Sequence, residues 1–387
     1  MTQLTACPKC SAPVGADEQY CEACGAELGQ PTAAAAAPAQ TPGNETPIQS
    51  APVTSGHDAT CHECGGSVAA DGYCSECGVK ARSLRDHFTE RPATWVAGVC
   101  DRGIRHSRNE DAMALDARAE PSSHAVLVVC DGVSSSTDSD VASLAAARAA
   151  RDVLARSSAS GIGTAGARVA VSVKALEAAV EAANDAVIAN TAAGSGSPAS
   201  CTFVAGVLDA SLLVVACVGD SRAYWFPDAG EPRMLTTDDS FAAEQIASGV
   251  SRAEAENGPQ AHAITKWLGS DAPDHTPSTT TLDLDSPGWV LLCSDGLWNY
   301  CSEAKDLAAL VHQMDHAATP DPLGLAGSLV DWANTQGGVD NITVTLARIG
   351  PRPDITTPPV AATAATPAVH SGTEHREEGP HDGNVLS

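Results

Sequence analysis

The chain has 387 residues, of which 43% are hydrophobic and only 4% aromatic, and its formal net charge at pH 7 is −26. A protein this acidic is repelled by nucleic acid and by anionic lipid, so neither is expected as a partner. No apolar run approaches the roughly 20 residues that span a bilayer, and the N-terminus lacks the basic start and apolar stretch of a signal peptide. We therefore expect a cytoplasmic protein with no membrane partner.

Composition changes along the chain and predicts five regions. Residues 1–28 and 57–80 each carry two closely spaced cysteine pairs. Between them, residues 29–56 are rich in Ala, Pro and Thr and hold almost no large apolar side chain, which is typical of a flexible linker. Residues 94–350 have a globular composition and are long enough for one catalytic domain. Residues 351–387 are again rich in Pro and Ala and are expected to be a disordered tail.

The cysteine pairs predict two small zinc-binding modules. Two residues between thiolates let one tight turn present both sulfurs to one ion, and two such turns complete the tetrahedral four-cysteine site of structural zinc. Iron in an iron–sulfur or rubredoxin-like site is the minor alternative. Redox pairs fit less well, because no thioredoxin-like βαβ pattern surrounds them. The predicted zinc ligands are Cys7, Cys10, Cys21 and Cys24 in the first module and Cys61, Cys64, Cys74 and Cys77 in the second.

Zinc ribbons often bind nucleic acid, but the charge of these modules argues against it. The first module sets Lys9 against Asp17, Glu18, Glu22 and Glu27, and the second is similarly acidic. Four thiolates around a zinc ion add further negative charge. We expect the modules to act in protein interaction rather than in nucleic-acid binding.

The globular region predicts an α+β fold. Short apolar runs of strand character lie at residues 94–100, 125–132, 201–209, 211–221, 289–296 and 341–349. Two Ala-rich segments, 139–156 and 165–191, have helical composition and few helix breakers. The strands and helices do not alternate strictly, which favours a layered α+β sandwich over a doubly wound parallel sheet.

Acidic residues follow several of the predicted strands. Carboxylates that gather at one edge of a sandwich cannot all stay ionised without cations, and magnesium or manganese are the ions that oxygen ligands prefer. A single Asp-Gly pair is an ordinary turn signal, but four aspartates at strand ends together with an acidic pair favour a metal site. The residues concerned are Glu110, Asp111, Asp131, Asp220, Asp295 and Asp340.

The ordered motifs GIRHSRNEDA, VVCDGVSSS, VGDSRAY, LLCSDGLW and GGVDNITV resemble those of the type 2C metal-dependent (PPM-type) protein serine/threonine phosphatases, especially the bacterial branch. The resemblance covers about residues 94–350, and the ordered set is specific although each motif alone is weak. It implies a four-layer α-β-β-α sandwich, in which two antiparallel sheets are flanked by helices. It also implies a binuclear manganese or magnesium centre at one end of the sandwich.

By that resemblance, Asp131 bridges two metals, the carbonyl of Gly132 ligates one of them, and Asp295 and Asp340 complete the protein ligands of the other. Two metals about 3.5–4 Å apart would activate a water that attacks phosphorus in line and displaces the serine or threonine oxygen.

The resemblance assigns the remaining carboxylates lesser parts. Glu110 and Asp111 would act mainly through coordinated waters. Asp220, together with Asp295, would hold a third, weaker metal that is seen in bacterial relatives.

The sequence departs from the family pattern at two places. Many relatives bind the substrate phosphate with an arginine at the position of His106; here Arg105, His106 and Arg108 are the candidates for that role, or all three are polar loop residues. Val133 stands where eukaryotic members keep a histidine as candidate general acid, so the leaving group would take its proton from water. Residues 236–275 match the variable flap of the family in position.

Three functions follow from these patterns. The first is a phosphatase that acts on phosphorylated proteins, opposite bacterial-type serine/threonine kinases. The second is a catalytically weak or inactive phosphatase-like domain that binds a partner, with the cysteine modules as docking elements. The third, a zinc-ribbon nucleic-acid adaptor, is disfavoured by the acidity of both modules.

Overall fold

A computed structural model describes residues 60–351, except for residues 62, 158–162, 193, 259 and 316–318. The chain divides into two compact units, Met1–Pro52 and Val53–Ser387, and all described residues belong to the second. The predicted first cysteine module, the linker at 29–56 and nearly all of the predicted tail lie outside the described residues.

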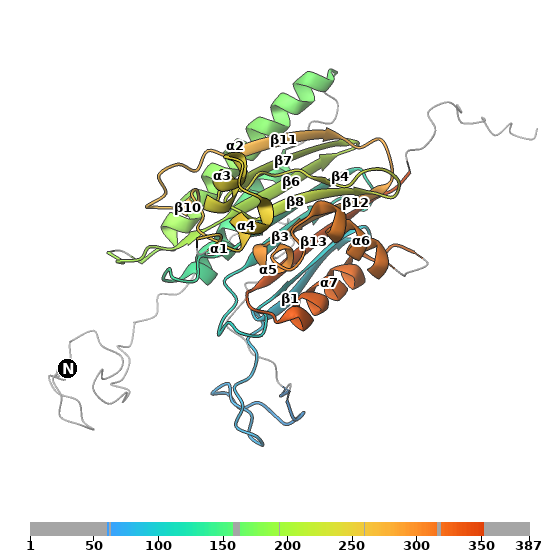
Figure 1. The fold of residues 1–387 in the computed structure, drawn as a ribbon. Coiled ribbons are helices and arrows are strands. Elements are labelled where there is room, and N and C mark those ends of the chain that lie inside the picture. Colours follow the sequence, from blue (N-terminus) through green and yellow to red (C-terminus); the bar gives the residue numbers. More distant parts are fainter. Residues whose placement is uncertain are drawn as a thin grey trace, which may run out of the picture. The chain divides into compact units, whose positions relative to one another are not determined.

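Two antiparallel sheets form the centre of the second unit (Figure 1). Adjacent strands of the first sheet are, in order, β1 (His87–Ala93), β2 (Val96–Asp101), β13 (Ile342–Ile349), β12 (Gly288–Cys293), β8 (Arg222–Pro227) and β9 (Arg233–Met234). The second sheet has the order β11 (Ser278–Asp283), β7 (Leu212–Val218), β6 (Phe203–Asp209), β4 (His124–Cys130) and β3 (Ala112–Ala117). A separate short ladder pairs β5 (Ser200–Cys201) with β10 (Leu268–Gly269).

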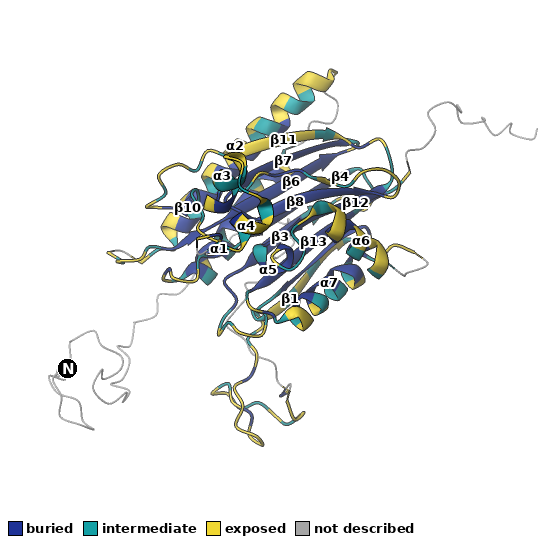
Figure 2. Ribbon diagram, viewed as in Figure 1, coloured by how far each residue is buried: buried dark blue, intermediate teal, exposed yellow. Residues whose placement is uncertain are grey.

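Alternating side chains fix how the two sheets pack. All seven residues of β4 are buried. Leu127 and Val129 enter the apolar core between the sheets, whereas Val126 and Val128 enter the core beneath the helices. Because successive side chains of a strand point to opposite faces, a strand that is buried on both faces must be apolar throughout. Figure 2 shows the resulting buried centre.

Helices cover both outer faces of the sandwich (Figure 1). The helices α1 (Ser139–Arg156) and α2 (Ala165–Ala189) pack on the second sheet, and the Thr164 side chain caps α2 by accepting a hydrogen bond from Ala167 N–H. The first sheet carries α5 (Asp295–Trp298), α6 (Ala304–Met314) and α7 (Pro322–Gln336). The short helices α3 (Phe241–Ala247) and α4 (Arg252–Glu256) lie in the predicted flap segment.

This architecture confirms the predicted four-layer α-β-β-α class. The helix α1 has the predicted bounds, and α2 ends at Ala189, before the predicted residue 191. The strands β1, β3, β8 and β11 lie outside the apolar runs that predict strands. The strand β11 is an exposed edge strand of sequence STTTLD, so it lacks the apolar character that marks the predicted strands. Within the described part of the chain, no helix combines the length and the apolarity needed to cross a bilayer.

Candidate active site

The sandwich brings the predicted acidic residues to one end of the two sheets. Asp131 directly follows β4, Asp111 directly precedes β3, and Asp295 begins α5 just after β12. The pKa of Asp131 lies well above its usual range, because the side chain is buried and because the carboxylates of Asp111, Asp295, Asp340 and Asp220 lie near it. Five segments that are distant in sequence therefore place negative charge at one point.

Asp111 is the most firmly held of these carboxylates. Its Oδ2 accepts hydrogen bonds from Ser294 Oγ at 2.6 Å and from Thr343 Oγ1 at 2.7 Å. Burial nevertheless raises the pKa of Asp111 to about 7. Two neutral hydroxyls thus orient the carboxylate without neutralising it.

Glu110 is fixed through its backbone and its side chain. Its N–H donates to Asn341 Oδ1 at 2.7 Å, and its Oε1 accepts from Arg108 Nε at 2.7 Å. The amide of Asn341 in turn donates to the carbonyls of Arg102 and Arg108. One asparagine thereby ties the loop before β3 to the start of β13.

Three buried carboxylate oxygens of this group have no hydrogen-bond partner in the structure: Glu110 Oε2, Asp111 Oδ1 and Asp295 Oδ1. An unpaired buried acceptor costs free energy, and an ionised one costs more. Burial also raises the pKa of Asp295 to about 6, with a further rise from Asp340. Hard divalent cations such as magnesium and manganese bind carboxylate oxygens, so the donor set fits the predicted metals.

Two glycines allow the close backbone approach that the site needs. A Cβ on Gly132 would lie 2.7 Å from the Glu110 carbonyl oxygen, and a Cβ on Gly296 would lie 1.9 Å from the Asn341 carbonyl oxygen. Both distances are too short for any side chain, so these positions accept only glycine without a backbone shift. The glycines next to Asp131 and Asp295 let the strand ends meet.

The structure places the three candidate phosphate-binding residues differently. His106 lies between two carboxylates, with Nε2 at 3.3 Å from Asp340 Oδ1 and Nδ1 at 3.6 Å from Glu110 Oε2. Arg108 is engaged by Glu110 and also donates to the Ser136 carbonyl and Ser139 Oγ. Arg105 is exposed and makes no ion pair with a described residue.

Asp220 sits beside the anchor of the flap segment. Its carbonyl accepts from Trp298 Nε1 at 2.9 Å, and burial followed by the Asp295 charge raises its pKa well above the usual range. The Arg222 guanidinium lies over the Trp298 ring at 3.5 Å and pairs with Asp238 at 2.7 Å. Asp238 belongs to the flap segment, so Arg222 joins that segment to the acidic end of the sandwich.

The second cysteine module forms a compact group of four sulfurs. The Sγ atoms of Cys61, Cys64, Cys74 and Cys77 all lie within 4.8 Å of one another. Three of their separations are 3.4, 3.5 and 3.6 Å, close to the roughly 3.8 Å edge of a tetrahedron with zinc–sulfur bonds of about 2.3 Å. The backbone N–H groups of Cys77 and Glu76 lower the pKa of the Cys74 thiol to about 6, whereas hydrogen bonds with neighbouring sulfurs raise the pKa of the Cys64 and Cys77 thiols.

Sequence reasoning missed the neutral residues that hold the acidic ones. Ser294, Asn341 and Thr343 carry no charge and were not singled out, although Ser294 precedes Asp295 and Asn341 follows Asp340. Their position inside the quoted motifs was the available signal. The buried Arg222 was also missed; its place inside the motif VGDSRAY was the available signal.

Comparison with known proteins finds phosphatase relatives of this chain. The family model for Protein phosphatase 2C matches residues 103–333. The chain is 33% identical over 146 residues to a serine/threonine phosphatase stp of Listeria innocua, covering 38% of this chain and 55% of the relative. It is 30% identical over 268 residues to the serine/threonine protein phosphatase PstP of Mycobacterium tuberculosis, covering 65% of this chain and 44% of the relative. The chain thus spans about half the length of these curated relatives.

Solved structures show the same fold. The Mycobacterium tuberculosis phosphatase PstP/Ppp matches with a TM-score of 0.51 at 27% identity, over 66% of this chain and 97% of that one. A structure described as the catalytic domain of PstP in complex with two manganese ions matches with a TM-score of 0.50 at 25% identity, over 66% of this chain and 98% of that one.

Proposed function

The chain belongs to the Protein phosphatase 2C family, and from this premise we propose that it is a metal-dependent protein serine/threonine phosphatase. The observation that carries the proposal is the set of three buried carboxylate oxygens without a hydrogen-bond partner, on Glu110, Asp111 and Asp295. Among them, Glu110 Oε2 lies 3.6 Å from His106 Nδ1. Such a set is costly in a protein without cations and suited to a protein that binds them. Its substrates would be phosphoserine and phosphothreonine in phosphorylated proteins, including substrates of bacterial serine/threonine kinases.

The metal ligands in this proposal are Asp131, the carbonyl of Gly132, Asp295 and Asp340, with two manganese or magnesium ions as in the manganese-bound relative. When bound, such ions supply Lewis-acid activation of a water nucleophile and offset negative charge on the phosphoryl group. The chain's own residues would hold and orient this centre. Asp131 would be oriented by its place at the end of β4, and Gly132 allows the close approach of its backbone to the Glu110 carbonyl oxygen.

The other carboxylates have supporting parts in the proposal. Glu110 and Asp111 would bind the ions mainly through water, with Arg108, Ser294 and Thr343 fixing their orientation. Asp220, close enough to Asp295 for the Asp295 charge to raise its pKa, would hold a third, weaker ion.

We propose that His106, rather than Arg108, binds the phosphate group of the substrate. His106 is partly exposed and lies against both Glu110 and Asp340, so it borders the acidic centre. Arg108 donates hydrogen bonds to Glu110, Ser136 and Ser139, the first at 2.7 Å, which is shorter than either carboxylate contact of His106, so it serves to position Glu110. Arg105 is a second candidate, because it is exposed and free of ion pairs among the described residues.

The cysteine modules would hold structural zinc, and the four converging sulfurs of the second module support this for one of the two ions. We propose that the modules bind proteins and that the chain acts in the cytoplasm. The alternative function, a weak or inactive phosphatase-like binding domain, is favoured by the histidine at 106 and disfavoured by the retained Asp131, Asp295 and Asp340.

The proposal is tested by phosphate release from a phosphothreonine peptide and from the matching phosphotyrosine peptide with manganese present. We expect turnover of the first and little of the second, and loss of turnover in the Asp340→Asn variant. Equal hydrolysis of both peptides, or full activity of the variant, would contradict it.

A further inference from the structure

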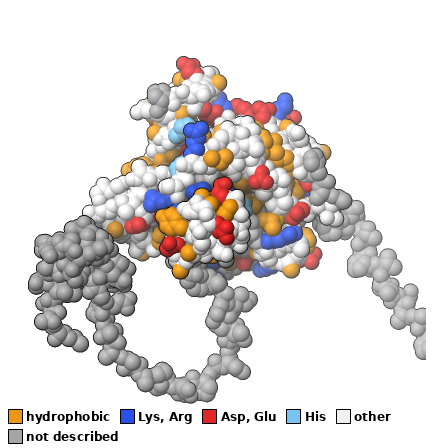
Figure 3. Space-filling view, turned by 90° about the horizontal axis from the view of Figure 1, so that it is seen from below, with side chains coloured by type: hydrophobic (Ala, Val, Ile, Leu, Met, Phe, Trp, Pro, Cys, Tyr) orange, Lys and Arg blue, Asp and Glu red, His pale blue; other side chains and the backbone are white. Residues whose placement is uncertain are grey.

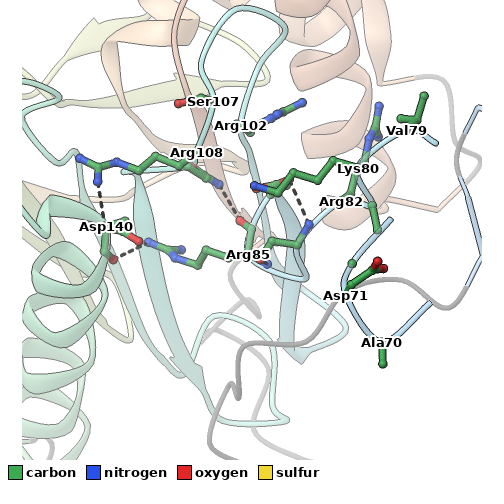
Figure 4. A pocket seen from close by; sticks show the side chains of 15 residues that line it. Ala70, Asp71, Val79, Lys80, Arg82, Arg85, Arg102, Ser107, Arg108 and Asp140 are labelled. Atoms are coloured by element: carbon green, nitrogen blue, oxygen red, sulfur yellow. Dashed lines mark hydrogen bonds and ion pairs between the residues drawn. The ribbon is translucent and has the colours of Figure 1, made fainter. Parts of the chain in front are cut away.

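A cleft of about 590 Å³ lies between the second cysteine module and the loops that lead into the catalytic domain. One wall is made by the module segments 70–72 and 79–82, and the other by residues around Arg85, Arg102 and Arg108 (Figure 4). The cleft is separate from the acidic centre described above. It shares with that site only the loop at 107–109.

The charge of this cleft is opposite to that of the chain. Its lining includes five cationic side chains and three acidic ones, whereas the whole chain has a net charge of −26. The cations are Lys80, Arg82, Arg85, Arg102 and Arg108, and the acids are Asp71, Asp86 and Asp140. Lys and Arg side chains are also interspersed with Asp and Glu on the face seen in Figure 3, so the acidic excess does not make the surface uniformly negative.

The acidic side chains of the cleft do not neutralise its cations fully. Asp71 and Asp86 accept hydrogen bonds from the backbone N–H groups of Tyr73 and Ser83. Asp140 lies 3.8 Å from Arg108 and is the only one of the three that forms an ion pair with a cleft cation within the described residues. Arg108 also pairs with Glu110 at 2.7 Å, whereas the other four cations of the cleft make no ion pair within the described residues.

Two guanidinium nitrogens in the cleft are buried and have no hydrogen-bond partner in the structure, Arg85 Nη1 and Arg102 Nε. A guanidinium whose donors are incompletely matched is stabilised by negative charge nearby, so an anion in the cleft would be bound favourably. Lys80 and Arg82 are exposed at the opposite wall and make no ion pair with a described residue. The cleft is therefore lined by planar guanidinium groups and by the ammonium group of Lys80. Both kinds of group bind tetrahedral oxyanions such as phosphate.

We propose that this cleft is a second anion site, separate from the metal centre, and that it binds a phosphate group. The proposal goes beyond the phosphatase function and does not require turnover. A ligand here would touch the catalytic loop, because Arg85 donates to the Asp111 carbonyl and Arg108 to the Glu110 carboxylate. The phosphate can come from a free phosphorylated small molecule or from a phosphorylated segment of a protein.

The test is a calorimetric titration of the full chain, loaded with zinc, in an Asp131→Ala background that preserves phosphorylated probes. The probes are inorganic phosphate, a peptide with two phosphoserines and the same peptide with one. The test variant is Lys80→Gln with Arg82→Gln. The matched control is Lys174→Gln with Arg156→Gln, which removes two exposed cations on α2 and α1, outside the cleft.

We expect the test variant to weaken binding of at least one probe roughly tenfold and the control to leave it unchanged. Arg102→Gln, which removes an unpaired buried donor, should weaken the same probe. Tighter binding of the doubly phosphorylated peptide would identify a protein segment as the source, and equal loss for inorganic phosphate would identify a small ligand. Unchanged binding of every probe in both cleft variants, or no binding that depends on the cleft, would overturn the proposal.

Discussion

The Ser294 hydroxyl donates a 2.6 Å hydrogen bond to Asp111 Oδ2, and this bond joins residues that are 183 positions apart in the chain. The other carboxylate oxygen of Asp111 is buried and unpartnered. Two hydroxyls thus orient the carboxylate, while its second oxygen stays open to a ligand. Bound cations would therefore stabilise the cluster of carboxylates around Asp111.

The first prediction concerns that charge. Replacing Asp111 by Asn keeps an acceptor for Ser294 and Thr343 but removes the buried negative charge. Without manganese at pH 8, we expect Asp111→Asn to unfold at a higher temperature than the wild type. Its free energy of unfolding should be larger by a few kcal/mol, on the order of the cost of the buried charge. With manganese present, the wild type should unfold at the same temperature as Asp111→Asn or at a higher one. If Asp111→Asn unfolds at a lower temperature than the wild type both with and without manganese, the buried charge of Asp111 does not destabilise the metal-free protein.

The second prediction is the pH dependence of the manganese-free chain. Burial raises the pKa of Asp111 to about 7 and of Asp295 to about 6, so the folded state binds protons more tightly than the unfolded state. Stability from these groups is full below the unfolded pKa of about 4 and falls as the pH rises through about 6 and about 7. Thermal melts without manganese should therefore show lower stability at pH 8 than at pH 5.5, with a smaller drop in Asp111→Asn. A rise in stability over this range would contradict the assignment.

The third prediction separates the residues at 105, 106 and 108 by their kinetics. His106→Ala should raise the KM for a phosphothreonine peptide about tenfold, since it borders the acidic centre, and His106→Arg should restore binding. Arg108→Ala should instead raise the manganese concentration needed for half-maximal activity, because it frees Glu110. If Arg105→Ala alone raises the KM, the phosphate-binding role belongs to Arg105.

The fold was predictable from the sequence where its signals are local. The apolar runs that end in aspartate mark the strand ends, and the Ala-rich segment 139–156 marks a helix with the same bounds as α1. The hydrogen bonds of Asp111 with Ser294 and Thr343 were not predictable from the sequence, because the partner of a Ser or Thr hydroxyl depends on which strands the fold brings together. The same is true of Asn341, which reaches the Glu110 N–H across 231 positions. Each acidic residue is marked by a local motif, whereas its hydrogen-bond partners are set only by the fold.

The fourth prediction concerns the anchor of the flap segment. Arg222 and Asp238 are both almost fully buried, and Asp238→Ala leaves the guanidinium only its longer ion pair with Glu256 at 3.3 Å. The variant should lower the free energy of unfolding by about 3 kcal/mol, the low end of the range for a broken buried pair. The control is Asp228→Ala, which breaks a more exposed pair with Arg348 and should cost no more than about 1 kcal/mol. Denaturant unfolding measures both. Equal losses would mean that burial does not set the strength of these pairs.

The fifth prediction concerns zinc. Native mass spectrometry should find two zinc ions in the wild type and one in Cys74→Ser, because three sulfurs of the second module then remain. Cys301→Ser, a substitution outside the sulfur group, is the control and should keep both ions. Zinc content that is the same in Cys74→Ser and in the control would exclude the second module as a zinc site.

The most direct test of the metal-centred site is hydrolysis of a phosphothreonine peptide by the wild type and by Asp131→Ala, each with manganese and with a chelator. Asp131 is half-buried, lies near four other carboxylates and would hold both ions, so its loss should abolish turnover. We predict activity in the wild type with manganese and in no other combination. Wild-type activity that survives the chelator, or Asp131→Ala activity equal to that of the wild type, would contradict the metal-dependent phosphatase.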